Sequence, residues 1–390
     1  MSEQIAYLDC AATIPLRQIA QDAWLEAIEQ LRAVPGNPAA LHSGGRKAKR
    51  LLEDARERVA QCVGADRAEV IFTSGATESN ALAIVGALRA VRQKTGRTVV
   101  QVGASDHPSS WNQRHRVEAE GGEWVPLGIT TQGQIDLGQL SSQAAVVSVA
   151  AVSSEIGVIQ PVRELASRRD TATIFHVDAA QALHTQAVDL YEDGIDLLTI
   201  AGHKIGAPVG IGALAIKRGT ALQTDRPGGD QESRHRSGTV DVAGASALAA
   251  ALIEVTEQRD AFTRRCHQLR NRLLGGLPAH VRPTTSAPTA PTIIHLSIPT
   301  AHPEALLLGL DRHGVLASAG SACHAGVTRP SRVLLEMGRT RDEALGVLRI
   351  SLGPTTTEAD IDAFLAALPD ALEGAKALDA LHTPSSRISS

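Results

Sequence analysis

Lys204 is the lysine whose surroundings suit covalent chemistry. The chain has six lysines, and five of them lie in charged or polar contexts that a solvated surface explains. Lys204 instead lies in LLTIAGHKIGAPVGIGAL, directly after an apolar run and before a glycine-rich stretch. An amine in partly dry surroundings loses its proton more easily and can form a Schiff base. A surface lysine in a loop after a strand is the alternative for this segment taken alone.

Two other polar side chains also follow apolar runs. Asp178 ends TIFHVD, 26 residues before Lys204, and its carboxylate could pair with a pyridinium nitrogen, the alternative being a helix N-cap. Gln181 would lie near the hydroxyl group of such a ring if the chain turns helical there. His107, in GASDHPSS, could stack on a cofactor ring and move protons, although a histidine in such a place is more often an ordinary loop residue.

The segment TSGATESN, residues 73–80, could hold a phosphate. Small residues follow an apolar run and open a helix, which leaves the amides of Ala76 and Thr77 free to bind an anion. Many turns from strand to helix look like this one, so the segment alone is a weak signal. Phosphate cradle, histidine, carboxylate and lysine occur in that order, each after a predicted strand. Together they predict a pyridoxal phosphate (PLP) site.

Cys323 lies in ASAGSACHAG, residues 317–326, where small residues leave its sulfur uncrowded. A nucleophilic thiol needs access and mobility, whereas a structural cysteine usually has large apolar neighbours. The four cysteines are scattered, form no CxxC pair and accompany no HExxH motif, so we expect reduced thiols and no metal site. A small buried hydrophobic residue is the alternative for Cys323.

The elements that must position these residues alternate between strands and helices, which predicts a parallel sheet covered on both faces. Ligands of such sheets bind at the carboxyl ends of the strands, where the candidate residues fall. The expected strands are residues 70–74, 98–104, 144–153, 173–178, 196–201 and 210–216.

A second α/β unit follows residue 241. We expect a long helix over 243–274, a strand in TIIHLSI, a helix at PEALLLGLDRHG, a strand in LRISLG and a helix from 357. The arginines of the long helix (Arg264, Arg265, Arg270 and Arg272) are interpreted as a solvated face, and the last ten residues as a disordered tail.

The composition is that of a soluble globular protein. Of the 390 residues, 43% are hydrophobic and 21% charged, and the formal net charge is −4. This charge gives no reason to expect direct binding of nucleic acid or of an anionic membrane. The start of the chain lacks the pattern of a signal peptide, and no apolar run is long enough to cross a bilayer, so we expect a cytoplasmic protein.

The residues resemble a known family. YLDCAAT, GNPAALH, FTSGATESN, SSEIGVIQP, HVDAAQ, AGHKIGAPVGIGAL, RHRSGTVD, SAGSACHAG and LRISLG are similar to the successive motifs of cysteine desulfurases, PLP enzymes of aminotransferase fold type I, class V. The resemblance covers about residues 5–370. It implies a large domain (16–250) with a mostly parallel seven-stranded sheet flanked by helices, and a smaller α/β domain (1–15 and 251–380) that carries the cysteine loop, before a tail (381–390).

The resemblance also implies roles for individual residues. Lys204 would be the Schiff-base lysine, Cys323 the nucleophile and Arg349 the clamp for the substrate carboxylate. Asp178 would bind the ring nitrogen, Gln181 and Ser154 would face the ring oxygen, and His107 would lie over the ring. Ala76, Thr77 and His203 would hold the phosphate, and Thr239 would reach the phosphate of the partner subunit in a homodimer.

Three positions depart from the family pattern. Ser154 stands where an asparagine normally contacts the ring oxygen, so this contact would be lost or bridged by water. Ala201 stands where a serine usually donates to the phosphate, which would weaken cofactor binding by about 1.5–3 kcal/mol. His324 follows the cysteine in place of a threonine or serine and would tune the thiolate.

The implied activity is conversion of L-cysteine to L-alanine, with transfer of the sulfur to Cys323 as a persulfide for delivery to an acceptor protein. Iron–sulfur cluster assembly, tRNA thiolation and DNA phosphorothioation all use such enzymes, and the sequence leaves this choice open. Two alternatives also stay open. One is a selenocysteine lyase or another PLP-dependent β-lyase, and the other is a non-catalytic sulfur-carrier scaffold.

Overall fold

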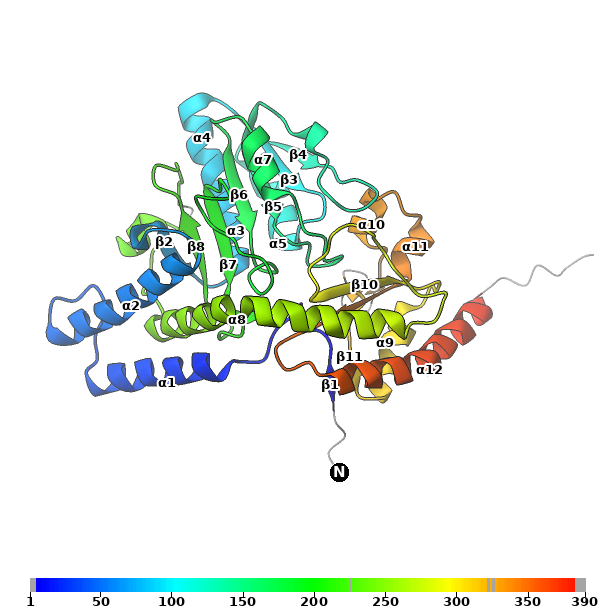
Figure 1. The fold of residues 1–390 in the computed structure, drawn as a ribbon. Coiled ribbons are helices and arrows are strands. Elements are labelled where there is room, and N and C mark those ends of the chain that lie inside the picture. The colour runs from blue at the N-terminus through cyan, green and yellow to red at the C-terminus, as the bar shows by residue number, and fades with distance from the viewer. Residues whose placement is uncertain (1–4, 225, 321–322, 325–326, 383–390) are drawn as a thin grey trace, which may run out of the picture.

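The computed structural model describes residues 5–224, 226–320, 323–324 and 327–382. A seven-stranded sheet in the order β2-β8-β7-β6-β5-β3-β4 forms the upper part of the molecule in Figure 1. Its strands are β2 (Val70–Thr73), β3 (Val99–Gly103), β4 (Glu123–Leu127), β5 (Ala144–Ala150), β6 (Ile174–Asp178), β7 (Leu197–Ala201) and β8 (Gly212–Ile216).

The sheet is mostly parallel, as the sequence predicts. Only β8 runs against its neighbours, since it is antiparallel to both β7 and β2. Six strands coincide with the expected apolar runs. β4 is missing from the expected set. It lies at the edge of the sheet, buries only Leu127 completely, and contains Pro126, which is tolerated in an edge strand.

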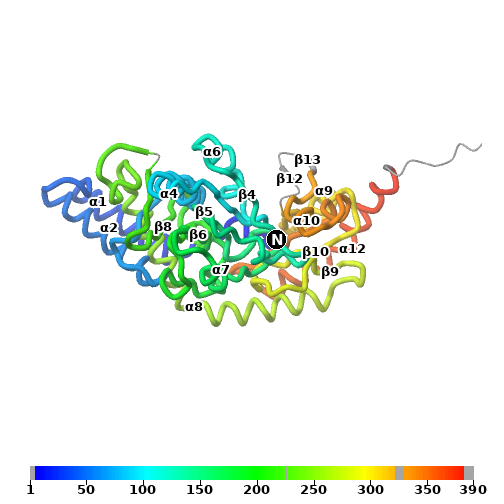
Figure 2. The backbone as a smooth tube through the Cα atoms, turned by 90° about the horizontal axis from the view of Figure 1, so that it is seen from above, coloured from blue at the N-terminus to red at the C-terminus, as the bar shows by residue number. Residues whose placement is uncertain are grey.

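Helices cover both faces of this sheet. Along the inner strands, alternate side chains enter two different cores: Val147 and Val149 belong to one, whereas Val146 belongs to the other. Figure 2 shows α4 and α6 on one side of the strands and α7 and α8 on the other. The helices of this part are α1 (Gln18–Ala33), α2 (Ser43–Cys62), α3 (Ala76–Ala81), α4 (Ala87–Thr95), α5 (Pro108–Trp111), α6 (Arg114–Ala119) and α7 (Val162–Arg168).

The long helix α8 (Val242–Gly275) connects two cores. Most of its residues up to Val255 are buried in the core of the large sheet, whereas Cys266, Leu269 and Leu273 belong to a second core. That core lies on a three-stranded sheet of order β14-β10-β9. The elements that follow α8 include β9 (Arg282–Pro283), β10 (Ile293–Ser297), α9 (Pro303–Arg312), α10 (Arg332–Glu336), α11 (Arg341–Leu345), β14 (Val347–Ser351) and α12 (Glu358–His382). Of these, α10 and α11 are buried in a separate, smaller core. The division into domains of residues 16–250 and of 1–15 with 251–380 stays a prediction.

The N-terminal segment lies between the two cores. β1 (Ala6–Tyr7) pairs in parallel with β11 (Val315–Leu316), and Leu8 is buried in the second core. A few residues later, Ile14 N–H donates to His203 O (3.1 Å) next to the large sheet. Residues 9–13 therefore bridge the two cores at the edge where β7 ends.

Two local expectations are wrong. Arg265 and Arg270 do not lie on a solvated face, because Arg265 donates to Pro354 O (2.8 Å) and Arg270 to Ile293 O (3.0 Å), which fixes α8 to the second core. The helix α12 runs to His382, so the first two residues of the expected tail are helical, and residues 383–390 lie outside the described residues. None of the described helices has the length and apolar character needed to cross a membrane.

Candidate active site

A cavity of about 300 Å³ opens where β5, β6 and β7 end, with Ala150, Asp178 and Ala201 in its wall. This is the edge at which ligands of parallel sheets bind. Eight of the predicted site residues line it, although they come from five different segments: Ala76, Thr77, His107, Ser154, Asp178, Gln181, His203 and Lys204.

The predicted phosphate turn begins at Gly75, whose φ of 144° is a conformation that favours glycine. A Cβ on Gly212 of β8 would lie 2.7 Å from the Cα of Gly75, so the lack of a side chain at Gly212 lets β8 pack against the turn. The helix starts at Ala76 and continues through a π-helical turn into α4, which ends at Thr95. The amides of Ala76 and Thr77 are in its first turn, where an α-helix leaves N–H groups available for an anion.

Asp178 is held at the floor of the cavity by two hydrogen bonds. Its Oδ1 accepts from Ala180 N (2.9 Å) and its Oδ2 from Asn80 Nδ2 (2.7 Å). The residues after Asp178 form turns, so it is not the N-cap of an α-helix. Asn80 is fully buried and was missed, although it lies within TSGATESN, one helical turn after Thr77 and therefore on the same side of the helix.

His107 is the N-cap of α5, and its Nδ1 accepts from Ser109 N (3.1 Å). Nδ1 also lies 2.8 Å from Ser109 Oγ, which can accept from an Nδ1–H, and in that tautomer Nε2 is free to accept a proton. The ring lines the cavity, but burial by the surrounding protein lowers its pKa below the ordinary value. The nearby Asp178 opposes this shift, whereas Lys204 and Arg349 add to it, so the ring is neutral at pH 7. A neutral imidazole at this place can accept a proton.

Lys204 extends its amine between two carbonyl groups of the N-terminal segment. Nζ lies 2.5 Å from Ala11 O and 2.7 Å from Ala12 O. Burial lowers the pKa of this amine to about 8, with a further lowering by Arg349 that Asp9 and Asp178 partly offset. The pKa is thus shifted towards the range in which an amine becomes a nucleophile near neutral pH.

The same segment contacts two more predicted residues. Gln181 Nε2 donates to Ala11 O (2.8 Å), and His203 Nδ1 lies 3.2 Å from Thr13 Oγ1. Residues 11–13 therefore contact three of the predicted site residues, a role that the motif YLDCAAT does not indicate by itself. The contact of Gln181 with a ring oxygen stays a prediction. The sequence analysis made it depend on a helix at this point, whereas the structure has turns there.

Arg349 lies in a smaller cavity of about 190 Å³, which shares His107 and Ser154 with the first. Its Nη1 donates to Ser154 O (2.9 Å) and its Nη2 pairs with Asp9 Oδ1 (2.8 Å), while Nε is buried without a partner among the described residues. The predicted carboxylate clamp is thus next to the site, and Asp9 is its present counterion. Ser154 contributes its backbone oxygen here, and Ala201 is 1% exposed in the wall of the larger cavity.

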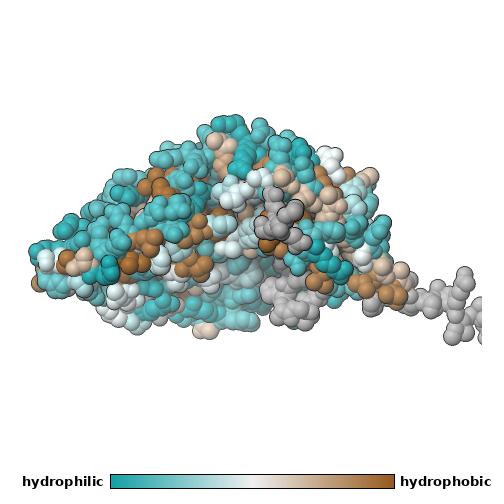
Figure 3. Space-filling view, turned by 90° about the horizontal axis from the view of Figure 1, so that it is seen from below, coloured by the Kyte–Doolittle hydropathy of each residue, from teal (hydrophilic) through white to brown (hydrophobic). Residues whose placement is uncertain are grey.

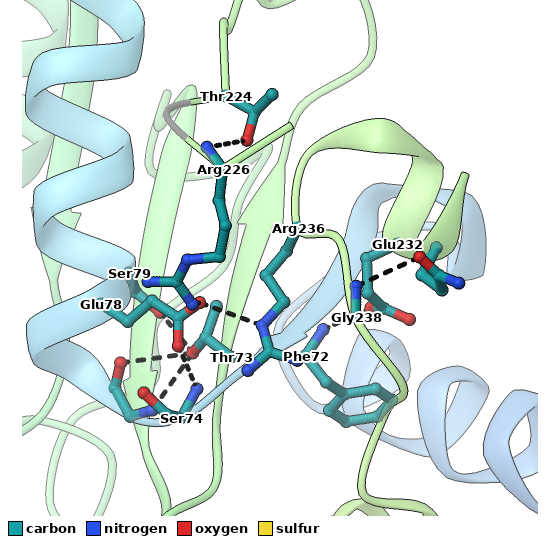
Figure 4. A network of polar contacts seen from close by, with 12 residues as sticks. Phe72, Thr73, Ser74, Glu78, Ser79, Thr224, Arg226, Glu232, Arg236 and Gly238 are labelled. Atoms are coloured by element: carbon teal, nitrogen blue, oxygen red, sulfur yellow. Dashed lines mark hydrogen bonds and ion pairs between the residues drawn. The ribbon is translucent and has the colours of Figure 1, made fainter. Parts of the chain in front are cut away.

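Thr239 does not line the larger cavity of its own chain. It is exposed and lies beside Arg56 and Glu232 at another surface depression. Figure 4 shows the loop that carries it, tied to the phosphate turn through Glu78. The Glu78 carboxylate accepts from Arg226 Nη1 (2.9 Å), Arg236 Nε (3.0 Å) and Ser74 N (2.7 Å).

Cys323 is described only in its backbone. It forms the two-residue strand β12 (Cys323–His324), which pairs with β13 (Val327–Thr328) in antiparallel fashion. The side chains of Cys323 and His324 lie outside the described part of the chain, as do the loop residues Ala322 and Gly326. Their predicted roles therefore stay predictions. At the base of this segment, Gly320 has a φ of 61° and lines the smaller cavity.

Comparison with known proteins identifies the family. The model of the family "Aminotransferase class-V" matches residues 6–364. The chain belongs to this family. Among class-V aminotransferases it groups with cysteine desulfurases, since it is 36% identical to the "IscS-like cysteine desulfurase" of Mycobacterium tuberculosis over 95% of this chain and 97% of that protein. These relatives favour a desulfurase over the lyase and over the non-catalytic scaffold.

Two solved structures of other proteins have the same fold as this chain. A "NifS-like protein" superposes with a TM-score of 0.85 at 26% identity, covering 95% of this chain and all of that chain. The structure "SspA in complex with cysteine" superposes with a TM-score of 0.74, also at 26% identity, and covers 90% of this chain and 99% of that one. The fold predicted from the sequence is therefore confirmed.

Membership of the class-V aminotransferases implies PLP, and the residues of the cavity fit it. The site offers a lysine amine with a lowered pKa, a carboxylate fixed by two hydrogen bonds and a turn with helical N–H groups, all around one cavity. These groups suit, respectively, the aldehyde, the ring nitrogen and the phosphate of this cofactor.

Proposed function

We propose that this protein converts L-cysteine to L-alanine with PLP as cofactor and transfers the sulfur to Cys323. The observation that carries the proposal is the convergence of Lys204, Asp178, His107 and the turn at Ala76 and Thr77 on one cavity. Support for the substrate comes from the relative named a cysteine desulfurase and from the similar structure that holds cysteine.

In this proposal each residue has a defined task. Lys204 would hold the aldehyde end of the cofactor, Asp178 would keep the ring nitrogen protonated, and Ala76, Thr77 and His203 would bind the phosphate. Bound PLP supplies an electron sink for the bonds of the substrate. Gln181 and Ser154 face the ring oxygen. The neutral His107 and the Lys204 amine accept and return protons, which their lowered pKa values allow near pH 7.

The sulfur transfer balances without an added oxidant or reductant. An S–S bond forms between the Cys323 thiolate and the substrate sulfur, while the substrate C–S bond breaks and its electron pair stays with the carbon that becomes the methyl group of alanine. That carbon takes up one proton. One thiol and one L-cysteine thus give one persulfide and one L-alanine.

Arg349 would bind the substrate carboxylate from the smaller cavity. Its contact with Asp9 keeps the guanidinium oriented, and its buried Nε has no partner among the described residues, so the arginine has capacity for an anion. The substrate carboxylate would then bind Arg349 together with Asp9 or would replace Asp9 as its partner.

We also propose a homodimer in which Thr239 reaches the cofactor of the partner subunit. Thr239 is exposed and outside its own cavity, and α1 carries exposed apolar side chains such as Ile19, Leu25 and Ile28. Figure 3 shows apolar patches within the polar surface on the underside of the molecule. Covering such patches stabilises an association.

The persulfide would pass to a sulfur-acceptor protein in iron–sulfur cluster assembly, tRNA thiolation or DNA phosphorothioation. The protein itself would bind neither nucleic acid nor membrane. Because the chemistry needs a reduced thiol, we place it in the cytoplasm.

The test uses Cys323→Ala, with Cys62→Ala as the control because Cys62 is a half-buried free cysteine on α2. Purified protein is incubated with L-cysteine, and the gain of a sulfur atom is read by intact mass alongside alanine and sulfide release. Wild type and Cys62→Ala should gain the sulfur and Cys323→Ala should not. Full sulfide release by Cys323→Ala would instead indicate a lyase. Lys204→Ala should lose the yellow colour of the bound cofactor, and an unchanged spectrum would refute its role.

A further inference from the structure

Arg332 reaches from α10 to the segment that carries His107. It is the first residue of α10, and its side chain donates from Nη1 to Ala104 O and from Nη2 to Asp106 O (2.8 Å). The same guanidinium lies 3.8 Å from the centre of the Trp111 ring. Ala104 and Asp106 precede His107, and Trp111 follows it on α5. One side chain therefore holds the chain on both sides of the histidine.

The base of Arg332 is itself firmly fixed. Ser331 is fully buried, donates from its hydroxyl to Glu155 Oε1 and accepts from Leu334 N (3.1 Å) as the N-cap of α10. Ser331 N also donates to Ala344 O (2.8 Å). The next residues of α10, Val333 and Leu334, are buried in a core with Ile156 and Val158. A guanidinium that starts from such a base can hold its partners in one place.

The segment that Arg332 holds is the wall shared by the two cavities. His107 lines both, whereas Asp106, Glu155, Gly320 and Arg332 line the smaller one. Asp106 is 2% exposed, and its Oδ1 accepts from Ala150 N (2.9 Å) at the end of β5. The residues before His107 are thus attached to the large sheet on one side and to α10 on the other.

We propose that Arg332 is a positioning residue, which fixes His107 at the cavity and ties its position to α10 at the end of the cysteine-bearing segment. Arg332 follows Cys323 by nine residues, so the thiol and the histidine would share one anchor. This proposal rests on the function proposed above, because it gives His107 and Cys323 their roles in catalysis. A displacement of about 1 Å of a catalytic group can cost up to about a hundredfold in rate, which is why such an anchor matters.

The test compares Arg332→Gln and Arg332→Lys with Arg329→Gln. Arg329 is exposed and lies three residues earlier, so its substitution removes the same charge without touching the segment of His107. Two quantities are measured on holoenzyme: hydrogen–deuterium exchange of the peptide 104–111, and kcat for L-cysteine as a function of pH. Only the second requires catalysis.

Arg332→Gln should raise the exchange of peptide 104–111 and lower kcat about tenfold, since the histidine is less well placed. The acid limb of the pH profile should move to higher pH. The charged and titratable groups that face the His107 ring are Asp178, Lys204, His203 and Arg349. Because burial lowers the pKa of this ring, loosening the segment should return the pKa towards its ordinary value. Arg332→Lys keeps the charge but not the planar guanidinium, so its exchange and its kcat should lie between those of wild type and of Arg332→Gln.

The proposal is overturned if Arg332→Gln matches Arg329→Gln in exchange and in the acid limb. It is also overturned if exchange rises over the whole chain while the acid limb stays in place, because this would indicate a general loss of stability. If wild type releases no sulfide from L-cysteine, the proposed function fails, whereas the exchange experiment still decides whether Arg332 fixes the segment.

Discussion

Replacing Arg56 by methionine tests how the loop that carries Thr239 is held. Glu232 lies in this loop, and its side chain is 1% exposed. Both of its oxygens accept from Arg56, at 2.7 Å from Nη1 and from Nη2, and Oε2 also accepts from Phe72 N (2.5 Å). Glu232 and the next two residues have φ values of 48°, 53° and 67°, which are unfavourable for residues other than glycine. The ion pair therefore holds the loop in a conformation that it would otherwise leave.

The expected loss follows from what remains after the substitution. Methionine fills most of the volume of Arg56 but leaves a carboxylate buried with a single hydrogen bond, that of Phe72 N. Breaking a buried ion pair by removing one partner costs about 3–5 kcal/mol, because the remaining charge is uncompensated. The double variant Arg56→Met with Glu232→Gln should recover part of this loss, since the neutral amide oxygen can still accept from Phe72 N.

The free energy of unfolding is measured by urea titration, with Arg50→Met as the control because Arg50 is exposed on the same helix α2. The control should change stability by less than about 0.5 kcal/mol. Limited digestion with trypsin gives a local measure, since the loop contains Arg226, Arg234 and Arg236. If Arg56→Met loses less than about 1 kcal/mol and its loop resists trypsin as well as wild type does, the ion pair does not hold the loop.

Two further predictions concern pH and substrate binding. Burial lowers the pKa of His176 and His184 to about 4 and that of His295 to about 3, so these rings are neutral in the folded protein and take up protons on unfolding. Stability should therefore be full above about pH 6.5 and fall steadily towards pH 4, and urea midpoints that stay constant over this range would contradict it. Arg349→Lys should raise the KM for L-cysteine about tenfold, equivalent to about 1.4 kcal/mol, because a lysine cannot pair bidentately with a carboxylate. Steady-state kinetics checks this, and a KM within twofold of wild type would exclude Arg349 as the carboxylate clamp.

The predicted site residues that line the larger cavity share one property, a position shortly after a buried strand. Asp178 ends β6, and Lys204 follows β7 by three residues. Strand ends can be recognised locally because β5, β6 and β7 are buried along their whole length and read as apolar runs. Since parallel strands end at one edge, local signals were enough to bring these residues together.

The residues that were missed depend on contacts between distant parts of the chain. Asp9 meets Arg349 across 340 positions, and Arg332 meets Asp106 across 226. Neither contact leaves a pattern in the local sequence. Asn80 was within reach of sequence analysis, because helical spacing places it on the side of Thr77, but nothing local indicates that its partner is Asp178.

The departures at Ser154 and Ala201 have different consequences in this fold. Ser154 uses its backbone oxygen to orient Arg349 (2.9 Å), a contact that any residue can make, so the change from asparagine leaves this part of the site intact. Ala201 is buried at the end of β7 and cannot donate from its side chain. If the proposed function holds, the phosphate of the cofactor would be held by the helical turn at Ala76 and Thr77 and by His203. Gly75 and Gly212, which shape the turn, would then be more important for cofactor affinity.

The N-terminal segment explains how the site responds to movement between the two cores. The carbonyl groups of Ala11 and Ala12 accept from the amine of Lys204, and Asp9 pairs with Arg349. Lys204 and Arg349 therefore both contact residues 9–12. The same segment begins in β1, which pairs with β11 seven residues before Cys323. A shift of the second core relative to the large sheet would therefore move the counterion of Arg349, the partners of Lys204 and the base of the cysteine segment together. In this arrangement the N-terminal segment, which supplies no predicted catalytic group, links the positions of Lys204 and Arg349 to that of β11, which precedes the cysteine segment.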